Sequence, residues 1–233
     1  MKAIFDHQHR ENESIVSFWF RSEKLTSFMA GQFVELTLPH PNPDNRGPKR
    51  CFTLSSPPTD LPLISITTRL AKDHGSSFKR ALQNLKPDAK AVMSEPMGDF
   101  VLPKDVKRRL IFVAGGIGIT PYASIIRWLL AKKESRDITF IYAVANENDM
   151  VFQPELSCYG MKRITVVAQP LGKWSGESGL LNGQRLIQFA RPAPDDLIYL
   201  AGPEPMVEQL RTDLETQNIT SQQIITDHFP GYK

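Results

Sequence analysis

The hydrophobic positions of this chain change their pattern near residue 105. Before that point, Gly- and Pro-rich clusters separate short apolar or alternating segments, at residues 14–20, 33–38, 52–54, 63–68 and 90–93. Short strands at this spacing indicate an antiparallel barrel or sandwich. One helix, at residues 77–85, is predicted among these strands.

After residue 105 the apolar runs become continuous and alternate with helical segments. The predicted strands lie at residues 110–114, 138–144, 164–168, 197–200 and 223–226, and the predicted helices at residues 121–133, 184–190 and 205–217. This alternation is typical of a parallel sheet covered on both faces. We therefore expect a β domain at residues 1–103 and an α/β domain at residues 104–233.

Composition limits the class of protein. With 233 residues, of which 41% are hydrophobic and 23% charged, the chain can form two modest domains with packed cores. The formal net charge is only +3 and no long basic run occurs, so nucleic-acid binding is not expected. A weak basic bias would still suit an acidic protein partner.

The cysteines, histidines and apolar runs further limit the kinds of metal site, disulfide and membrane segment that the chain can contain. Cys51 and Cys158 cannot supply the four thiolates of a ferredoxin-type cluster, and the five histidines show no metal-binding spacing, so no metal site is expected. Two distant cysteines make no disulfide framework, which favours a reduced compartment. We find neither a secretory signal nor an apolar run long enough for a membrane span, so we expect a cytoplasmic protein.

Glycine-rich turns follow the first and fourth of the predicted parallel strands. The first turn runs from Gly115 to Pro121, and the second is Ala201-Gly202-Pro203. Glycines here let a pyrophosphate approach the backbone at a helix start, although an ordinary strand–helix turn would use them too. Within the first turn, Thr120 suits the N-cap and Pro121 the first helical position.

The segment Arg50-Cys51-Phe52-Thr53 carries side chains that suit a flavin. The Arg50 guanidinium could pair with a pyrophosphate, Phe52 could pack on a flat ring, and the Thr53 hydroxyl could reach a ring nitrogen. The alternative is a plain strand with one exposed charge.

A second group of candidates lies at the start of the helix predicted among the barrel strands. Gly75-Ser76-Ser77 opens this helix, Ser76 is a plausible cap, and the neighbouring N–H groups could bind the same phosphates. Arg69 is another cation nearby in the sequence. Lys79 and Arg80 are interpreted as solvated helix residues.

These segments together resemble the ferredoxin–NADP reductase superfamily, in particular its compact bacterial members without a fused ferredoxin domain. Six segments match in family order, at residues 50–53, 75–79, 96–100, 115–121, 201–206 and 227–229. The resemblance implies a six-stranded antiparallel Greek-key barrel that binds FAD, followed by a five-stranded parallel Rossmann-like domain that binds NAD(P)H. It also implies hydride transfer from nicotinamide C4 to flavin N5, with electrons passed to a separate protein such as a ferredoxin.

The same resemblance assigns roles to individual residues. Thr53, Ala201, Asp227 and Phe229 are the implied catalytic residues, although Ala201 replaces the family's cysteine and Asp227 its glutamate. Either Phe229 or Tyr232 would cover one face of the flavin. The implied cofactor-binding residues are Arg50, Cys51, Phe52, Thr53, Thr67, Arg69, Gly75, Ser76, Ser77, Gly115, Gly116, Gly118, Thr120, Pro121, Gly202, Pro203, Met206 and Tyr232.

The sequence leaves the coenzyme and the acceptor open. Glu147 and Asp149 follow the second parallel strand, where a carboxylate would bind a ribose 2′-hydroxyl. No Lys or Arg lies at residues 137–161 to bind a 2′-phosphate, so NADH is slightly preferred over NADPH. The alternatives to electron transfer are reduction of free flavin or a small oxidant, and a non-catalytic nucleotide-binding regulatory module.

Overall fold

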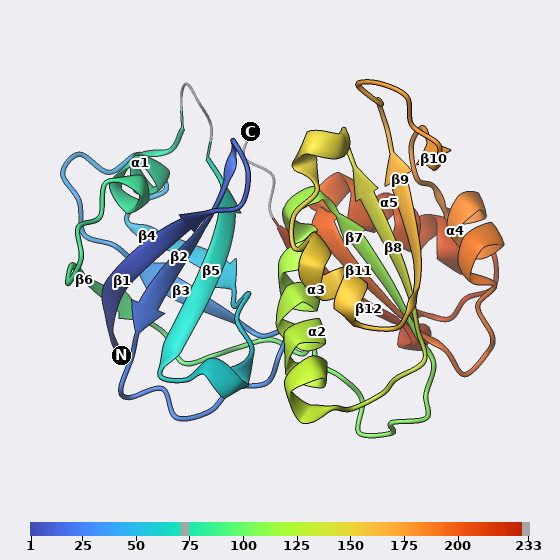
Figure 1. Ribbon diagram of the computed structural model, residues 1–233, viewed down its shortest axis with the longest axis horizontal. Helices are drawn as coiled ribbons and strands as arrows, with labels where there is room; N and C mark the ends of the chain where they lie inside the picture. Colours follow the sequence, from blue (N-terminus) through green and yellow to red (C-terminus); the bar gives the residue numbers. More distant parts are fainter. Residues whose placement is uncertain (71–74, 230–233) are drawn as a thin grey trace.

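The computed structural model describes residues 1–70 and 75–229, and its two sheets lie side by side (Figure 1). The N-terminal sheet has six antiparallel strands in the order β4-β3-β6-β1-β2-β5. Its elements are β1 (Lys2–Arg10), β2 (Ile15–Arg21), β3 (Phe33–Thr37), β4 (Lys49–Thr53), β5 (Leu63–Arg69), α1 (Ser77–Gln83) and β6 (Lys90–Met93). Beyond β4, a bridge between Leu54 and Ile66 joins the two edge strands, so the sheet closes into the predicted barrel.

Strand β1 is missing from the sequence prediction, which treats the first ten residues as a polar terminus. Ala3 and Phe5 are buried in the barrel core, whereas His7 and His9 are exposed. Because so few of its residues are apolar, hydropathy alone does not mark this strand. Its position between β2 and β6, with hydrogen bonds on both sides, stabilises it instead.

The C-terminal sheet is parallel and has six strands in the order β10-β9-β8-β7-β11-β12, one more than predicted. The five predicted strands are β7 (Leu110–Gly115), β8 (Ile138–Val144), β9 (Lys162–Val167), β11 (Leu197–Pro203) and β12 (Ile224–Phe229). The additional strand, β10 (Glu177–Ser178), has two exposed residues and leaves no hydrophobic run in the sequence. The predicted fold class is confirmed with this correction to the strand count.

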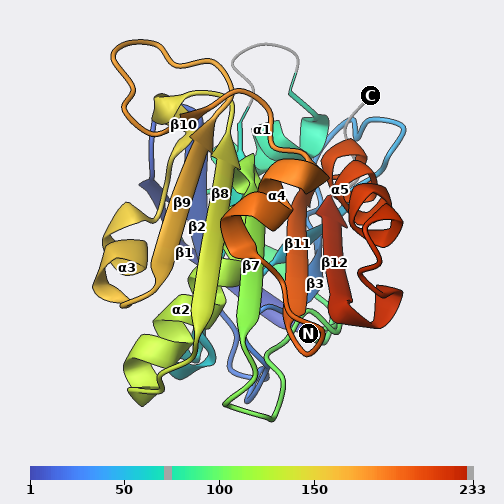
Figure 2. The same cartoon turned by 90° about the vertical axis from the view of Figure 1, so that its right-hand side faces the viewer.

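Helices cover both faces of the parallel sheet (Figure 2). They are α2 (Thr120–Lys132), α3 (Gln153–Cys158), α4 (Gly183–Ala190) and α5 (Glu204–Thr216). Helices α2 and α3 share a buried cluster with Phe112 and Phe140, whereas α4 and α5 share another with Ile111 and Val113. Successive β7 side chains thus enter different cores, because strand side chains alternate between faces. Within the described ranges, no helix is long and apolar enough to cross a membrane.

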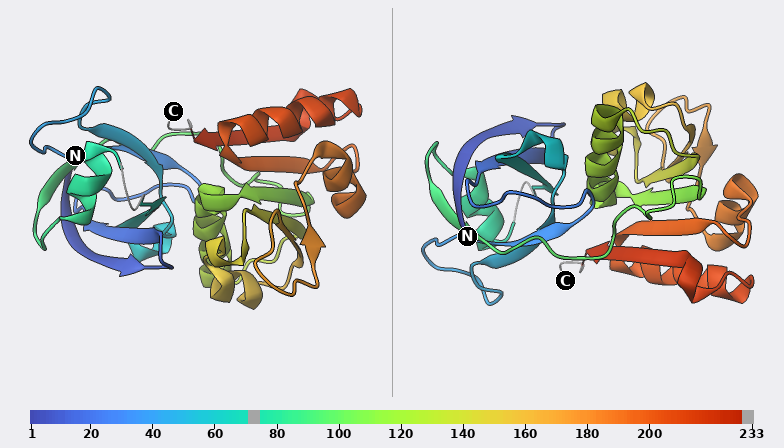
Figure 3. Two further views of the ribbon diagram at one scale, coloured as in Figure 1. Left: turned by 90° about the horizontal axis from the view of Figure 1, so that it is seen from above. Right: turned by 90° about the horizontal axis from the view of Figure 1, so that it is seen from below.

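Helix α2 also carries the contact between the two sheets, since it lies between the barrel and the parallel strands (Figure 3). Ile15, Ala30 and Phe100 of the N-terminal half belong to the same buried cluster as Tyr122 of α2. The chain crosses between the sheets at residues 94–109, and the predicted domain boundary at residue 103 falls in this connection.

Tyr122 joins α2 to two strands through a fully buried hydroxyl, which lies 2.8 Å from both Val113 O and Tyr199 O. Tyr122→Phe removes these bonds, and we expect it to lower the free energy of unfolding by about 1–3 kcal/mol. Chemical denaturation followed by circular dichroism measures the change. Tyr142→Phe is the matched control and should cost less, because the Tyr142 hydroxyl lies 3.4 Å from Asp149 O. Equal costs would contradict the prediction.

Candidate functional site

The carboxyl ends of β7 and β11 bring the two predicted glycine turns together. The strands are neighbours, with Ala114 opposite Ala201. A Cβ added to Gly202 would come within 3.1–3.2 Å of the Gly115 backbone, and one added to Gly118 would overlap the Ala201 carbonyl. Side chains are therefore excluded at the points where these backbones meet.

The turn after β7 is a 3₁₀ turn (Gly116–Ile119) that continues directly into α2. The predicted N-cap role of Thr120 is wrong, because Thr120 is already helical and its hydroxyl donates to Ile117 O at 3.2 Å. Pro121 is consequently the second helical residue rather than the first. Gly116 has a φ of +52°, and a Cβ added there meets nothing within 4 Å, so its backbone borders open space.

Pro203 and Met206 lie at the start of α5, where the second turn ends. Pro203 is the N-cap residue of this helix, and Met206 lies in its first turn. A Cβ added to Gly115 would overlap the Met206 side chain. A side chain at position 115 would therefore have to displace the end of the Met206 side chain.

Thr53 and Asp227 come from different sheets and meet at this edge. Strand β12 sets Asp227 beside Ala201 of β11, and Thr53 is the last residue of β4. The Thr53 hydroxyl donates to Asp227 Oδ2 at 3.2 Å. Ala201 is fully buried. Phe229 ends β12, whereas the predicted Tyr232 lies outside the described residues.

Cys51 and Phe52 lie on opposite sides of β4. Cys51 is exposed, and partial desolvation together with the Glu35 and Asp227 carboxylates raises the pKa of its thiol. Cys51 therefore lies on the Asp227 side of the strand. Phe52 is 6% exposed, and its ring centroid lies 5.7 Å from that of Phe78. The Phe52 ring thus belongs to the barrel core.

Arg50 is buried beneath the loop that connects β3 to β4, with a side chain only 8% exposed. Its Nη1 donates to the carbonyls of Arg46, Gly47 and Lys49 at 2.6–2.9 Å. Its Nη2 donates to Asp44 Oδ1 at 3.0 Å. Its Nε is also buried and has no hydrogen-bond partner among residues 1–70 and 75–229. The Nε–H of this buried cation therefore has no acceptor in the described part of the chain.

Helix α1 begins close to Arg50. Ser76 is its N-cap, as predicted, and accepts a hydrogen bond from Lys79 N at 3.2 Å. The Lys79 ammonium donates to Arg69 O at 2.8 Å. Burial, and then the charges of Arg46, Arg69 and Arg50, lowers the pKa of Lys79 to about 8. The interpretation of Lys79 as a solvated helix residue is therefore wrong, because tertiary contacts draw it into a cationic cluster.

Two of the residues predicted to bind cofactor are bonded to other parts of the protein. Arg69 Nη1 lies 2.7 Å from Asp149 Oδ1, so this pair joins the barrel to the parallel sheet. The Thr67 hydroxyl is buried, 2.7 Å from each of the hydroxyls of Ser17 and Ser55. These contacts do not connect either side chain to the glycine turns.

The two carboxylates that follow β8 have different surroundings. Asp149 is buried and paired with Arg69. Glu147 is partly exposed, and its Oε2 accepts Leu171 N at 3.0 Å, which lowers the pKa of this carboxyl. Glu147 is thus the accessible carboxylate of the two.

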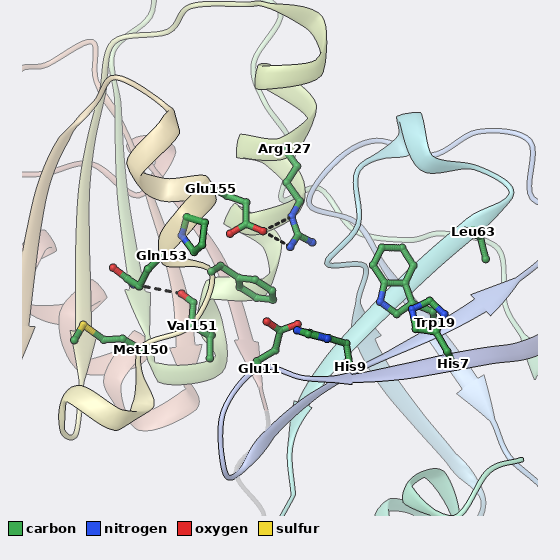
Figure 4. A pocket seen from close by; sticks show the side chains of 12 residues that line it. His7, His9, Glu11, Trp19, Leu63, Arg127, Met150, Val151, Gln153 and Glu155 are labelled. Carbon is green, nitrogen blue, oxygen red and sulfur yellow. Dashed lines mark hydrogen bonds and ion pairs between the residues drawn. The ribbon is translucent and has the colours of Figure 1, made fainter. Parts of the chain in front are cut away.

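The sequence does not predict a cavity of about 770 Å³ that lies between the barrel and α3 (Figure 4). Its charged and aromatic lining comprises His7, His9, Glu11, Trp19, Arg127, Phe152 and Glu155. Arg127 Nη2 lies 2.5 Å from Glu155 Oε1, and the guanidinium lies 4.9 Å from the Phe152 ring centroid. Neither Thr53 nor the glycine turns line this cavity. In the described part of the chain, no cluster of three or more His, Cys, Asp or Glu could hold a metal ion.

Known proteins share one segment of the sequence and the arrangement of the two sheets with this chain. Residues 112–212 match the oxidoreductase NAD-binding domain family. The cytochrome b5 reductase domain of Ulva prolifera nitrate reductase matches with a TM-score of 0.83 and 19% identity, over 97% of this chain and 96% of that one. A ferredoxin NADP+ reductase from Neisseria gonorrhoeae matches with a TM-score of 0.78 and 15% identity, over 98% of both chains.

The chain has the fold of the ferredoxin–NADP reductase superfamily. The resemblance predicted from the six sequence segments is thereby confirmed. A stachydrine N-demethylase reductase subunit of Rhizobium meliloti is 26% identical over 214 residues, which cover 88% of this chain and 59% of that protein. The chain spans 55–59% of the length of the first curated relatives that it matches.

Gly118→Ala tests the close approach at the glycine turns. The new methyl overlaps the Ala201 carbonyl, and we expect a loss of about 1–3 kcal/mol in the free energy of unfolding. Gly160→Ala is the matched control, since a Cβ there meets nothing within 4 Å, and it should leave stability within about 0.5 kcal/mol of the parent. Chemical denaturation compares the two, and similar values would show that the contact is not tight.

Proposed function

We propose that this chain is an NAD(P)H-dependent flavin oxidoreductase that passes electrons from bound FAD to a separate acceptor protein. The observation that carries the proposal is the hydrogen bond between Thr53 and Asp227, which joins the two sheets beside the glycine turns. A hydroxyl and a carboxylate held at this junction suit a reaction between one ligand on the barrel and another on the parallel sheet. The superfamily fold supports the same conclusion.

The barrel residues fit the diphosphate of FAD. Arg50 has a buried Nε without a partner among the described residues, and the charges of Arg46, Arg69 and Arg50 act on the nearby Lys79. A phosphate group provides several anionic acceptor oxygens, which match these donors. The cationic cluster is therefore the proposed FAD diphosphate site.

The turns at Gly116 and Gly202 fit a nicotinamide nucleotide. Gly116 borders open space at the end of β7, and Gly202 lies directly against the same strand end. Ligands of open parallel sheets bind outside the carboxyl ends of the strands, where the backbone N–H groups of the following turns interact with a pyrophosphate. Because Gly116 and Gly202 have no side chains, the backbone at this edge stays accessible to such a ligand.

Thr53 and Asp227 are the proposed residues at the reacting centre. Bound FAD would supply the acceptor for a hydride and then release electrons singly. Asp227 orients the Thr53 hydroxyl by accepting its hydrogen bond, and the Thr53 oxygen can in turn accept a hydrogen bond from a ring N–H. Ala201 contributes only a buried methyl, so it offers no group that could donate or accept a proton.

We propose NADH rather than NADPH as the preferred coenzyme. Glu147 lies after β8 as an accessible carboxylate, and its bond from Leu171 N favours the charged form. A carboxylate accepts a hydrogen bond from a ribose 2′-hydroxyl but repels a 2′-phosphate. For the acceptor, similarity to a demethylase reductase subunit supports a separate electron-carrying or oxygenase protein.

Anaerobic titration of the FAD-loaded chain, followed by flavin absorbance, tests this function. We expect NADH to bleach the flavin at about one equivalent, because hydride transfer delivers two electrons at once, and we expect NADPH to react more slowly. No bleaching by either nucleotide would contradict the proposal.

Thr53→Ala tests the reacting centre itself. Loss of the hydroxyl should slow flavin reduction by NADH about tenfold or more. A hydrogen bond to a charged group, or to an atom on which charge develops, changes a rate by at least that factor. Stopped-flow absorbance measures the rate. Thr59→Ala removes an exposed hydroxyl from the same barrel and should leave the rate unchanged. Equal rates in Thr53→Ala and the parent would rule out a role for Thr53 in the reaction.

A further inference from the structure

The side chain that accepts a hydrogen bond from Arg50 Nη2, that of Asp44, is itself an anion. We infer that Asp44 is an internal competitor for the proposed diphosphate site, bound to Arg50 in the cofactor-free chain and displaced when a cofactor diphosphate binds. This inference rests on the proposed FAD site. It adds that FAD binding replaces the Asp44 carboxylate with the cofactor diphosphate, so the diphosphate does not enter an empty site.

The Asp44 carboxylate makes the contacts that a phosphate would make. Its Oδ1 accepts Arg50 Nη2 at 3.0 Å, and its Oδ2 accepts Ser77 N at 3.0 Å. The Asp44 backbone N–H donates in turn to Ser77 Oγ at 2.8 Å. One carboxylate thus bridges β4 and the start of α1, the two segments that carry Arg50 and Lys79 of the proposed diphosphate site.

The exchange is favourable because Asp44 satisfies this site incompletely. Arg50 Nη1 donates to three backbone carbonyls and Nη2 to Asp44, whereas Nε is buried without a partner among the described residues. A guanidinium has five N–H donors, and a carboxylate has only two oxygens to accept them. A diphosphate brings more acceptor oxygens and more negative charge, so it can satisfy donors that Asp44 leaves.

The surrounding charges favour the larger anion further. Burial, and then the charges of Arg46, Arg69 and Arg50, lowers the pKa of Lys79 to about 8, so the charges of three arginines reach Lys79. Burial opposes the ionisation of Asp44, but hydrogen bonds from Ser77, Arg46 and Arg50 outweigh it and lower the pKa of Asp44 to about 2. Asp44 therefore stays charged at neutral pH, and another anion, rather than a proton, must release it.

The position of Asp44 allows such a displacement. It lies on the connection between β3 and β4, which is mostly exposed and contains no strand or helix. Gly47, which has a φ of +67° and no atom within 4 Å of an added Cβ, lies three residues further along the same connection. Asp44 can consequently leave Arg50 without unpairing the strands that hold Arg50 and Thr53.

Asp44→Asn in the flavin-free full chain tests the competition. The amide keeps the shape but loses the charge that competes, so we expect a Kd for FAD about tenfold lower than in the parent, the factor for one charge-assisted hydrogen bond. Flavin fluorescence during titration gives the Kd. Riboflavin, which has no phosphate, should bind equally to both proteins. Asp88→Asn, an exposed carboxylate of the same barrel, is the matched control and should not change the FAD affinity.

An unchanged or higher Kd in Asp44→Asn would overturn the inference, because Asp44 would then position Arg50 instead of competing for it. The second arm uses inorganic diphosphate alone and the thermal unfolding temperature. Diphosphate should stabilise Asp44→Asn more than the parent, and equal stabilisation would also overturn the inference. If FAD binds to neither protein, the proposed function fails, whereas the diphosphate arm still decides whether Asp44 competes with phosphate.

Discussion

The arrangement of the site depends on the backbone contact between the ends of β7 and β11. A Cβ at Gly202 would come within 3.1–3.2 Å of the Gly115 backbone, and the backbone of Gly118 packs against the Ala201 carbonyl because Gly118 has no side chain. Strand β12 continues the same edge and sets Asp227 beside Ala201. The pairing of β12 with β11 therefore sets where the Asp227 carboxylate meets Thr53 of the barrel.

Thr53 and Asp227 come from different sheets, so their hydrogen bond also requires a fixed contact between the two sheets. Helix α2 supplies it, because Tyr122 packs into the core below the glycine turns while Ser124 Oγ donates to Ser56 O at 2.6 Å on the barrel. The ion pair of Arg69 and Asp149 holds the same boundary further along. Apolar packing supplies most of the stability of this contact, and the directional polar bonds set its register.

The barrel holds a different constraint, the burial of like charges. Arg50 is buried, and burial together with the charges of Arg46, Arg69 and Arg50 lowers the pKa of the half-buried Lys79. Asp44 offsets part of this repulsion in the cofactor-free chain, and a diphosphate would offset more of it. Under the proposed competition, the stability of the empty barrel and its affinity for the cofactor therefore oppose each other through one carboxylate.

The sequence by itself determined the two kinds of sheet and the presence of glycine turns at two strand ends, because side-chain alternation and glycine-rich turns are readable along the chain. The crowding around Gly115 and Gly202 comes instead from Met206 and from the neighbouring strand, so only the tertiary structure decided it. Tertiary structure decided what depends on distant neighbours. Strand β1 forms through pairing on both sides despite its polar sequence, and Lys79 becomes half-buried only when α1 packs over β5. Likewise, Asp44 meets Arg50 and Ser77 because folding brings three separate segments together, and no local pattern encodes that charge balance.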